Sequence, residues 1–266
     1  FLLAIGALFL IVVPPPLRTA EGQAGKGNLW HEAAYGFKYI FERPSLLGYV
    51  IMLFIANFFL GFPNSVHLPL VLSRTGNNSL ILGAVETAGA ISWTAGSLIM
   101  SAWGGPKRRI HGALLDLIVY CVFGNILFGL GKSLEIWIPA ILIAGLGSNI
   151  GMATSQAILQ AKVAPDVQGR VFSARRLLTW FPDTFTPVLG GLLADHIMEP
   201  AMRTQSWVSG MFSWMVGTDP GSGMAVMMIV FGTLTILTML SGYLIPNIRR
   251  MEELLPDHVQ MPEEII

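Results

Sequence analysis

Long stretches without a charged residue are the feature that most constrains this chain. Residues 44–73, 87–106, 136–161 and 220–248 contain no Asp, Glu, Lys or Arg. Each is about as long as the roughly 20 apolar residues that a helix needs to cross a bilayer. Only 12% of the 266 residues are charged, whereas a soluble domain carries about 25%. The pattern excludes a water-soluble globule and a disordered chain, and it indicates a membrane protein.

The charge-free stretches predict an all-α, polytopic membrane fold, with a six-helix bundle over 46–245 that follows the end of another helix. Residues 1–13 lack the charged start and the cleavage site of a signal peptide, so we interpret them as the end of a helix. The predicted spans are 1–13 (partial), 46–70, 80–103, 111–131, 135–160, 177–196 and 223–245. Residues 14–45 are predicted to form a linker, and residues 246–266 a tail.

The distribution of basic residues gives the orientation. Thirteen of the sixteen Lys and Arg residues fall on the side of the linker and the tail, and three fall on the other side. The positive-inside rule therefore predicts a cytoplasmic linker, a cytoplasmic C-terminus and an inner (plasma) membrane location. Trp103, Trp137 and Trp180 fall near predicted span ends, where we expect them in the headgroup layer.

Two segments outside the spans have an amphipathic or aromatic character. In the linker, apolar residues recur at helical spacing from Trp30 to Phe41, which predicts an amphipathic helix on the membrane surface. The joint 197–222 carries Trp and Met residues with few charges, so we expect it to enter the outer interface. Ordinary loop packing is the alternative interpretation for both segments.

Several spans carry patterns that affect helix packing. Small residues recur every four positions in two of them, which favours close helix contact: Ala84, Ala88, Ser92 and Gly96, and Gly147, Gly151 and Ser155. Prolines are predicted to interrupt the span 177–196 at Pro182 and Pro187, and the span 46–70 at Pro63 and Pro69. Interrupted spans that line a cavity are typical of secondary transporters, and fixed kinks are the alternative. We take Pro63, Pro182 and Pro187 as candidate hinges.

Acidic residues inside the predicted spans are candidate functional groups, because a carboxylate in hydrocarbon is costly. Glu86 shares a helix face with Trp93 and is our main candidate for proton coupling, with snorkelling to the surface as the alternative. Asp116 lies within two turns of the basic cluster 107–109, which favours a structural charge lock. Asp183 lies two turns past Arg175 and Arg176 and fits either a lock or a relay. Asn57 is a further cavity candidate.

Signatures of other protein classes are absent from the sequence. The five His residues lack metal-site spacing, the single Cys121 excludes an intrachain disulfide, and no GxSxG, Walker A or Rossmann motif occurs. Sixteen basic residues balance sixteen acidic ones, which gives no indication of nucleic-acid binding. We therefore expect no enzyme activity, no cofactor and no metal, and we expect a small-molecule substrate and the lipid bilayer as partners.

Three motifs resemble the C-terminal half of major facilitator superfamily transporters: QAKVAPDVQGRVFS at 160–173, GGLLAD at 190–195 and GTDPGSG at 217–223. The likeness is greatest to the bacterial drug- and siderophore-exporter branch, of the macrolide-efflux and enterobactin-exporter type. Trp30, Gly36, Tyr39 and Ile40 fit the same pattern. The segment GGPKRR at 104–109 looks like a degenerate copy of the superfamily's Gly-and-Arg loop, without its usual Asp-Arg pair.

The resemblance implies helices seven to twelve of a twelve-helix transporter, preceded by the end of helix six. It implies a partner in the missing N-terminal half, and ion-driven export of a drug or siderophore-like molecule by alternating access. It places candidate cytoplasmic gate residues at Lys107, Arg108, Arg109, Asp116, Arg170, Arg175 and Arg176. A lysophospholipid or lipid flippase of the same superfamily, which would suit the aromatic 205–228 region, is one alternative. A non-transporting membrane scaffold is another.

Overall fold

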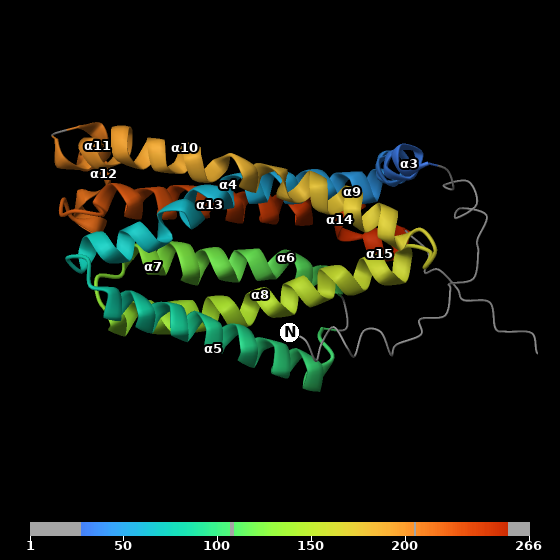
Figure 1. Cartoon of the computed structure of the whole chain (residues 1–266), viewed down its shortest axis with the longest axis horizontal. Coiled ribbons are helices and arrows are strands. Elements are labelled where there is room, and N and C mark those ends of the chain that lie inside the picture. The colour runs from blue at the N-terminus through green and yellow to red at the C-terminus, as the bar shows by residue number, and fades with distance from the viewer. Residues whose placement is uncertain (1–27, 107–108, 205, 255–266) are drawn as a thin grey trace, which may run out of the picture.

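The structure, a computed structural model, describes residues 28–106, 109–204 and 206–254, and these residues form helices that run side by side along the molecule (Figure 1). The predictions for residues 1–27, Lys107, Arg108 and 255–266 lie outside the described residues. No β-strand occurs in the ranges described, as an all-α fold requires. The long helices are α4 (Pro44–Arg74), α5 (Ser79–Trp103), α8 (Leu134–Lys162) and α13 (Ser222–Leu244).

The remaining helical elements are shorter. They are α3 (Leu29–Phe41), α6 (Arg109–Tyr120), the π-helix η1 (Cys121–Leu127), α7 (Phe128–Leu130), α9 (Gln168–Trp180), the 3-10 helix η2 (Phe181–Thr184), α10 (Thr186–Leu193), the π-helix η3 (Ala194–Met198), α11 (Glu199–Arg203), α12 (Trp207–Val216), α14 (Pro246–Arg249) and α15 (Met251–Leu254).

Four described helical runs are long and apolar enough to cross a membrane: α4, α6 to α7, α8 and α13. They agree with the predicted spans 46–70, 111–131, 135–160 and 223–245 to within a few residues. The two other predicted spans are not in this set. α5 coincides with 80–103, but Glu86 and many Gly, Ser and Thr residues lower its hydropathy, and the span 177–196 is divided into several elements.

The division of that span follows its prolines. Proline lacks the N–H that a helix needs, so it is favoured in the first turn of a new helix. Pro182 lies in the first turn of η2, and Pro187 lies in the first turn of α10. α4, in contrast, continues as one helix through Pro63 and Pro69, so the expected interruption of that span is wrong. Neighbouring helices hold α4 just before Pro63, since Phe62 stacks on Phe231 of α13 and Gly61 abuts Thr186 of α10.

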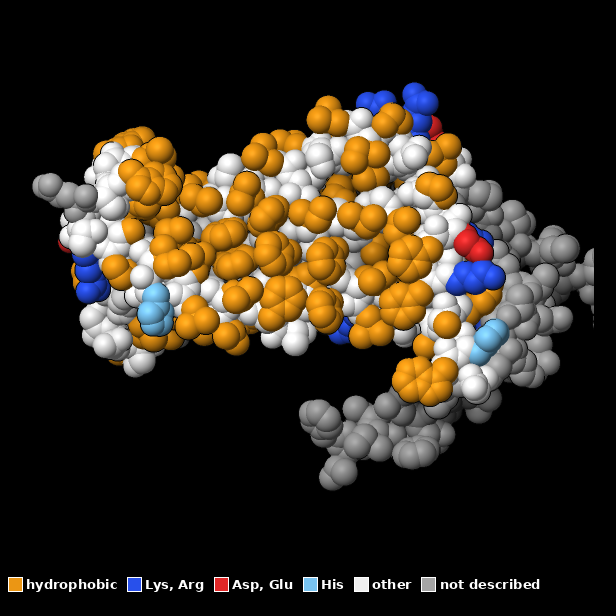
Figure 2. Space-filling view, turned by 90° about the horizontal axis from the view of Figure 1, so that it is seen from above, with side chains coloured by type: hydrophobic (Ala, Val, Ile, Leu, Met, Phe, Trp, Pro, Cys, Tyr) orange, Lys and Arg blue, Asp and Glu red, His pale blue; other side chains and the backbone are white. Residues whose placement is uncertain are grey.

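The bundle has two distinct ends (Figure 1). We call them the α3 end, where α3, α14, α15 and the start of α9 lie, and the α12 end, where α7, α11 and α12 lie. Figure 2 shows hydrophobic side chains over the middle of one face, with most of the visible charged side chains toward the two ends. This distribution is that of a protein whose middle lies in a hydrocarbon layer.

α3 packs on α9 instead of lying only on a membrane surface. Gly36, Tyr39 and Ile40 are buried, and a Cβ at Gly36 would lie 2.3 Å from the carbonyl oxygen of Arg170. Trp30, at the start of the same helix, is 85% exposed. α12 also has two faces, because Val208 and Val216 are buried whereas Trp207 is exposed. The exposed apolar face of α12 consists of Trp207, Met211 and Trp214.

The core at the α12 end surrounds two stacked aromatic rings. The ring of Phe128 stacks on that of Trp137 with centroids 5.8 Å apart, and the indole N–H of Trp137 donates to the Phe128 carbonyl at 3.1 Å. Trp137 is completely buried, so its predicted place in the headgroup layer is wrong. A partner for the indole N–H inside the bundle removes its need to reach the interface.

The two ridges of small residues contact different helices. On α5, Ala88, Ser92 and Gly96 are buried, and the Ser92 hydroxyl donates to the carbonyl of Leu142 on α8. On α8, the ridge faces α6, because a Cβ at Gly151 would overlap Asp116 and one at Gly147 would touch Val119. α8 therefore packs closely on both α5 and α6, as small residues allow.

Candidate functional site

A histidine and a glutamate meet between α4 and α5. His67 Nδ1 lies 3.8 Å from Glu86 Oε1, with the His67 side chain 17% exposed and that of Glu86 53% exposed. The His67 ring stacks on Phe128 with centroids 4.3 Å apart, and its Nε2 is buried without a hydrogen-bond partner. The pair thus joins a buried imidazole to a half-exposed carboxylate.

The antiparallel helix pair explains why these residues meet. His67 lies seven residues before the end of α4 at Arg74, and Glu86 lies seven residues after the start of α5 at Ser79. A rise of about 1.5 Å per residue puts both side chains about 10 Å from the turn that joins the helices. They therefore lie at the same depth, toward the α12 end.

Two further polar side chains lie near this pair. The Tyr120 hydroxyl at the end of α6 lies 3.5 Å from Asn64 Oδ1, one turn before His67 on α4, and Tyr120 is within electrostatic range of Glu86. On α5, Trp93 is 48% exposed. Its carbonyl accepts a hydrogen bond of 2.9 Å from Asn149 of α8. The side chains of Glu86 and Trp93, which were predicted to share a face of α5, are thus both about half exposed, and the backbone at Trp93 contacts α8.

Asp116 lies one turn before Tyr120 and packs against α8. A Cβ at Gly151 would be 1.9 Å from the Asp116 Cγ, so only glycine fits opposite this carboxylate. Asp116 Oδ1 accepts a hydrogen bond of 2.6 Å from the backbone N–H of Leu117. Among the described residues no cation lies at ion-pair distance from Asp116, so Arg109 does not form the expected charge lock, while Lys107 and Arg108 of the predicted cluster lie outside the described residues. The side chain points across to α8 and not back along α6, which explains the difference.

Near the α3 end, a tyrosine connects α4 to α8. The hydroxyl oxygens of Tyr49 and Ser155 are 2.8 Å apart, and Tyr49 lies within electrostatic range of both Asp116 and Arg175. Arg175 of α9 donates to Gln156 Oε1 at 3.4 Å, while its Nε is buried without a partner. Polar contacts thus extend from the middle of the bundle to α9.

These polar groups follow one another along the bundle, each in contact with the next, within electrostatic range of it, or no more than about one helical turn from it on the same helix. We call this series the polar column. Its members, from the α12 end to the α3 end, are Glu86, His67, Asn64, Tyr120, Asp116, Tyr49, Ser155, Gln156 and Arg175.

The candidate gate residues occupy the α3 end and have different partners. Arg170 forms an ion pair with Glu32 of α3, with Nη2 3.2 Å from Oε1. Arg109 donates to the carbonyl of Ala157 on α8 at 3.3 Å, and Arg176 lies 4.0 Å above the ring of Trp180. Of the predicted gate residues, the structure therefore brings Arg109, Arg170 and Arg175 into contacts between elements.

Asn57 and Asp183 lie near the break between α9 and α10. Asn57 Nδ2 donates to the carbonyl of Thr179 at 2.9 Å. That carbonyl is the acceptor that a 3-10 turn would use for the residue at position 182, where Pro182 has no N–H to donate. Asn57 therefore binds a backbone group that the proline leaves free. Asp183 is exposed in η2, and no hydrogen bond or ion pair of its carboxylate occurs in the described part of the chain.

Charged groups at the α12 end stabilise helix termini. Glu199 is 8% exposed, and its carboxylate accepts from the backbone N–H of Met224 at 3.1 Å and of Gly221 at 3.3 Å. These N–H groups belong to the start of α13, where a negative charge is favourable. Arg74 donates to the carbonyls of Gly129 and Gly131 at the end of α7, where a positive charge is favourable.

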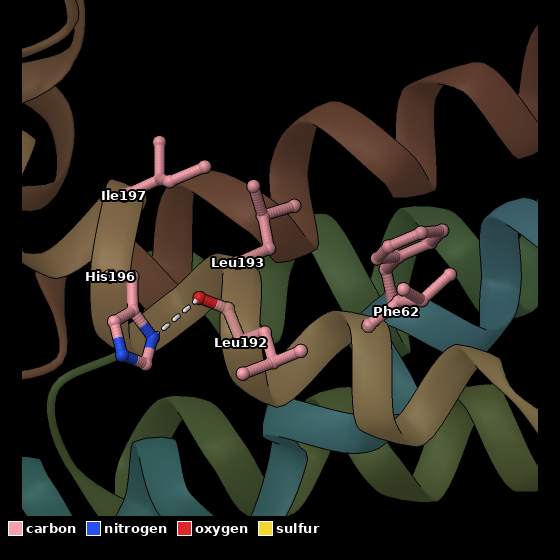
Figure 3. Close-up of a pocket in the computed structure, with 6 residues that line it drawn as sticks. Phe62, Leu192, Leu193, His196 and Ile197 are labelled. Carbon is pink, nitrogen blue, oxygen red and sulfur yellow. Dashed lines mark hydrogen bonds between the residues drawn. The ribbon is translucent and has the colours of Figure 1, made fainter.

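An apolar pocket opens beside α10. It has a volume of about 460 Å³ and is lined by Phe62, Leu189, Leu192, Leu193, His196 and Ile197. Figure 3 shows Phe62 of α4 at one end of the pocket and His196 at the other. His196 Nδ1 lies 3.3 Å from the Leu192 carbonyl, as the dashed line marks. The volume is within the range of small-ligand sites, and the lining suits an apolar group.

Sequence reasoning did not select several members of these sites as functional. Asn64, His67, Tyr49, Tyr120 and Glu32 were not singled out from the sequence. The depth rule for a helix hairpin would have connected His67 to Glu86, since both lie seven residues from the turn. No comparable signal connects Tyr49 to Ser155, which are 106 positions apart.

The long apolar helices define a multi-pass membrane protein. Comparison with family models matches residues 1–187 to the Major Facilitator Superfamily. The chain therefore belongs to the major facilitator superfamily, whose members are secondary transporters and generally not enzymes. No match was found among curated proteins or among solved structures.

Proposed function

We propose that this chain is the C-terminal six-helix bundle of an ion-gradient-driven exporter of a small amphiphilic molecule, drug-like or siderophore-like. It works by alternating access together with an N-terminal bundle. The observation that carries the proposal is the polar column. Polar groups within a membrane bundle are costly, and we take a series of them that continues through several helices as the mark of a solute or ion pathway.

The contacts at the α3 end support a gate on that side. The ion pair of Arg170 with Glu32 holds α3 against α9, and Arg175 connects α9 to α8 through Gln156. A single ion pair or hydrogen bond of this kind contributes only about 1 kcal/mol, so these contacts can open and close at low cost. They are suited to a contact that must be remade in each transport cycle.

The orientation proposed is a cytoplasmic α3 end and C-terminus in the inner (plasma) membrane. Lys162, Arg170, Arg175, Arg176 and Arg249 lie in α8, α9 and α14 near the α3 end. Among the described residues, the basic ones at the α12 end are Arg74, Lys132 and Arg203. The positive-inside rule supports the α3 end as the cytoplasmic one.

A lysophospholipid or lipid flippase is the second candidate, and the pocket beside α10 favours it. Its lining is almost wholly apolar and its volume of about 460 Å³ suits an acyl chain better than a polar drug. The exposed Trp207 and Trp214 on α12 would suit contact with lipid headgroups at the same membrane face.

Counterflow in proteoliposomes that contain the full-length transporter tests these candidates. Two fluorescent probes are compared: ethidium, an amphiphilic cation, and an NBD-labelled lysophospholipid. Rapid exchange of ethidium against unlabelled ethidium supports the exporter. Exchange of the lysophospholipid alone contradicts the exporter and supports the flippase. Exchange of neither probe contradicts both transport functions and supports the non-transporting scaffold.

A further inference from the structure

We propose that Glu86 and His67 form the proton-binding site of this transporter, in which Glu86 takes up the proton and His67 positions the carboxylate. The inference rests on the proposed function, because it assigns the ion that drives export. It follows from the distance between the two side chains, the unequal exposure of the two groups, and the unpartnered nitrogen of His67.

The distance between His67 and Glu86 is that of a contact that can form and break. The distance of 3.8 Å between His67 Nδ1 and Glu86 Oε1 is within ion-pair range but longer than the 2.7–3.2 Å that is typical of an N–H···O hydrogen bond. A permanent structural pair in a membrane interior needs closer contact and further hydrogen bonds to repay its desolvation. Glu86 has neither within the part of the chain that the structure describes.

The surroundings of His67 determine which group takes the proton. A protonated imidazole carries an N–H on both nitrogens. The Nε2 of His67 is buried and unpartnered, with the ring stacked on Phe128, so a proton there would lack an acceptor. The neutral ring with its N–H on Nδ1 points that N–H toward Glu86 and leaves Nε2 as an unpaired acceptor. The proton therefore goes to Glu86.

Glu86 is the more accessible of the two groups. The Glu86 side chain is 53% exposed on α5, and that of His67 is 17% exposed. Protonation converts the carboxylate to a neutral acid, which removes its attraction to His67. Release of the proton on the other side of the membrane restores the carboxylate, so one proton is carried per cycle and no other bond changes.

The other ionisable groups near the pair are few. Tyr120 is within electrostatic range of Glu86, and Cys121 follows it at the start of η1. On α4, Arg74 lies two turns beyond His67 and is bound to carbonyls of Gly129 and Gly131. α7 contains no ionisable residue. The ionisable residue of α13 is Tyr243, at the far end of that helix. The ionisable residues of α8 are Glu135 in its first turn and Lys162 in its last turn. No described group competes with Glu86 for the role of acid beside His67.

Infrared difference spectroscopy of the full-length transporter in lipid measures the site without any substrate. The signal is the carbonyl stretch of protonated carboxylic acids, recorded as the pH is lowered. Three variants are compared with the wild type: Glu86→Gln, His67→Gln and the matched control Glu135→Gln, which changes an exposed acid near the α12 end. Uptake of ethidium into inverted vesicles under an imposed pH gradient is recorded for the same proteins.

The site predicts three results. Glu86→Gln removes one titrating carboxylic-acid band and lowers gradient-driven uptake at least about tenfold, a change of about 1.4 kcal/mol. Glu135→Gln leaves the gradient-driven uptake and the Glu86 band at wild-type level. His67→Gln keeps that band but changes the pH at which it appears by about one unit, which a merely structural His67 would not do.

Other results overturn the inference. An unchanged set of bands in Glu86→Gln excludes Glu86 as the proton acceptor, whether or not the wild type transports ethidium. If Glu86→Gln does not fold, the His67→Gln variant provides the test. A carboxylic-acid band that titrates at the wild-type pH in His67→Gln would show that His67 does not position Glu86, which contradicts the proposed pair. A wild type that shows the Glu86 band but exchanges no probe contradicts the proposed export and leaves the proton site supported.

Discussion

Arg170 on α9 forms an ion pair with Glu32 on α3, with Nη2 3.2 Å from Oε1 and Nε 3.4 Å from Oε2, although 138 positions separate the residues. Two guanidinium nitrogens of Arg170 and both carboxylate oxygens of Glu32 take part, which is the side-by-side geometry that arginine favours with carboxylates. The Arg170 side chain is 20% exposed and that of Glu32 32% exposed. The linker helix is therefore fastened to the bundle at the α3 end.

We expect Arg170→Ala to impair transport while leaving membrane insertion intact. Loss of the pair frees α3 from α9 and costs about 1 kcal/mol in the closed state, which corresponds to about a fivefold change in the gate equilibrium. Efflux from vesicles measures the effect. Restored efflux in the charge swap Glu32→Arg with Arg170→Glu would attribute it to the pair itself.

The matched control for this prediction is on α3, the helix that carries Glu32. Lys38 and Glu42 form an exposed pair of 3.7 Å within α3, with side chains 69% and 59% exposed. Lys38→Gln therefore leaves efflux unchanged. Wild-type efflux by Arg170→Ala, or equal losses in both variants, would rule out a gate at Arg170.

Close contact of α4 with α10 predicts a steric effect at Gly61. A Cβ there would lie 2.0 Å from Thr186 Oγ1 and 2.5 Å from Thr186 Cβ, and Thr186 is completely buried. Gly61→Ala is expected to lower the free energy of unfolding by about 1–3 kcal/mol, because the two helices must separate. Thermal unfolding in detergent measures this.

Gly191 on α10 provides the control for Gly61. Nothing lies within 4 Å of a Cβ at Gly191. Gly191→Ala should therefore leave the melting temperature unchanged or raise it, since alanine is the better helix former. Equal melting temperatures for Gly61→Ala and the wild type would show that the α4–α10 contact is looser than the structure indicates.

Charge and proline positions predicted the helices, but not which side chains meet. The stretch 136–161 predicted α8 to within two residues at each end, because few other patterns allow 26 uncharged positions. Arg109 does not form the expected lock with Asp116, because nearness along α6 does not fix the direction of a side chain, and Gly151 on α8 leaves space for the carboxylate. Trp137 was misplaced for the same reason, since the Phe128 carbonyl is a partner that the sequence does not reveal.

The bond from Asn57 to the Thr179 carbonyl predicts a specific loss of stability. Asn57→Ala leaves a backbone acceptor without its partner next to the break at Pro182, which costs about 1–2 kcal/mol. Thr179→Val is the control, because the acceptor is the backbone carbonyl and not the hydroxyl. A drop in melting temperature for Thr179→Val as large as that for Asn57→Ala would mean that local packing, and not this bond, stabilises the break.

Glu199 and Arg203 allow the capping of α13 to be separated from an ion pair. Arg203 lies 3.9 Å from Glu199 with its side chain 60% exposed, so Arg203→Ala is expected to change stability by less than about 0.5 kcal/mol. Glu199→Ala removes the acceptor of the Gly221 and Met224 N–H groups and should cost about 2 kcal/mol. Chemical denaturation of both variants in detergent makes the comparison, and equal effects would assign the stability to the ion pair.

The most direct test of the central claim is gradient-driven uptake of ethidium into inverted membrane vesicles that contain the full-length transporter. We predict uptake when the vesicle interior is acidic, and its collapse when a protonophore removes the gradient. Uptake that persists after the gradient is removed, or no uptake above that of vesicles lacking the protein, would contradict an ion-driven exporter.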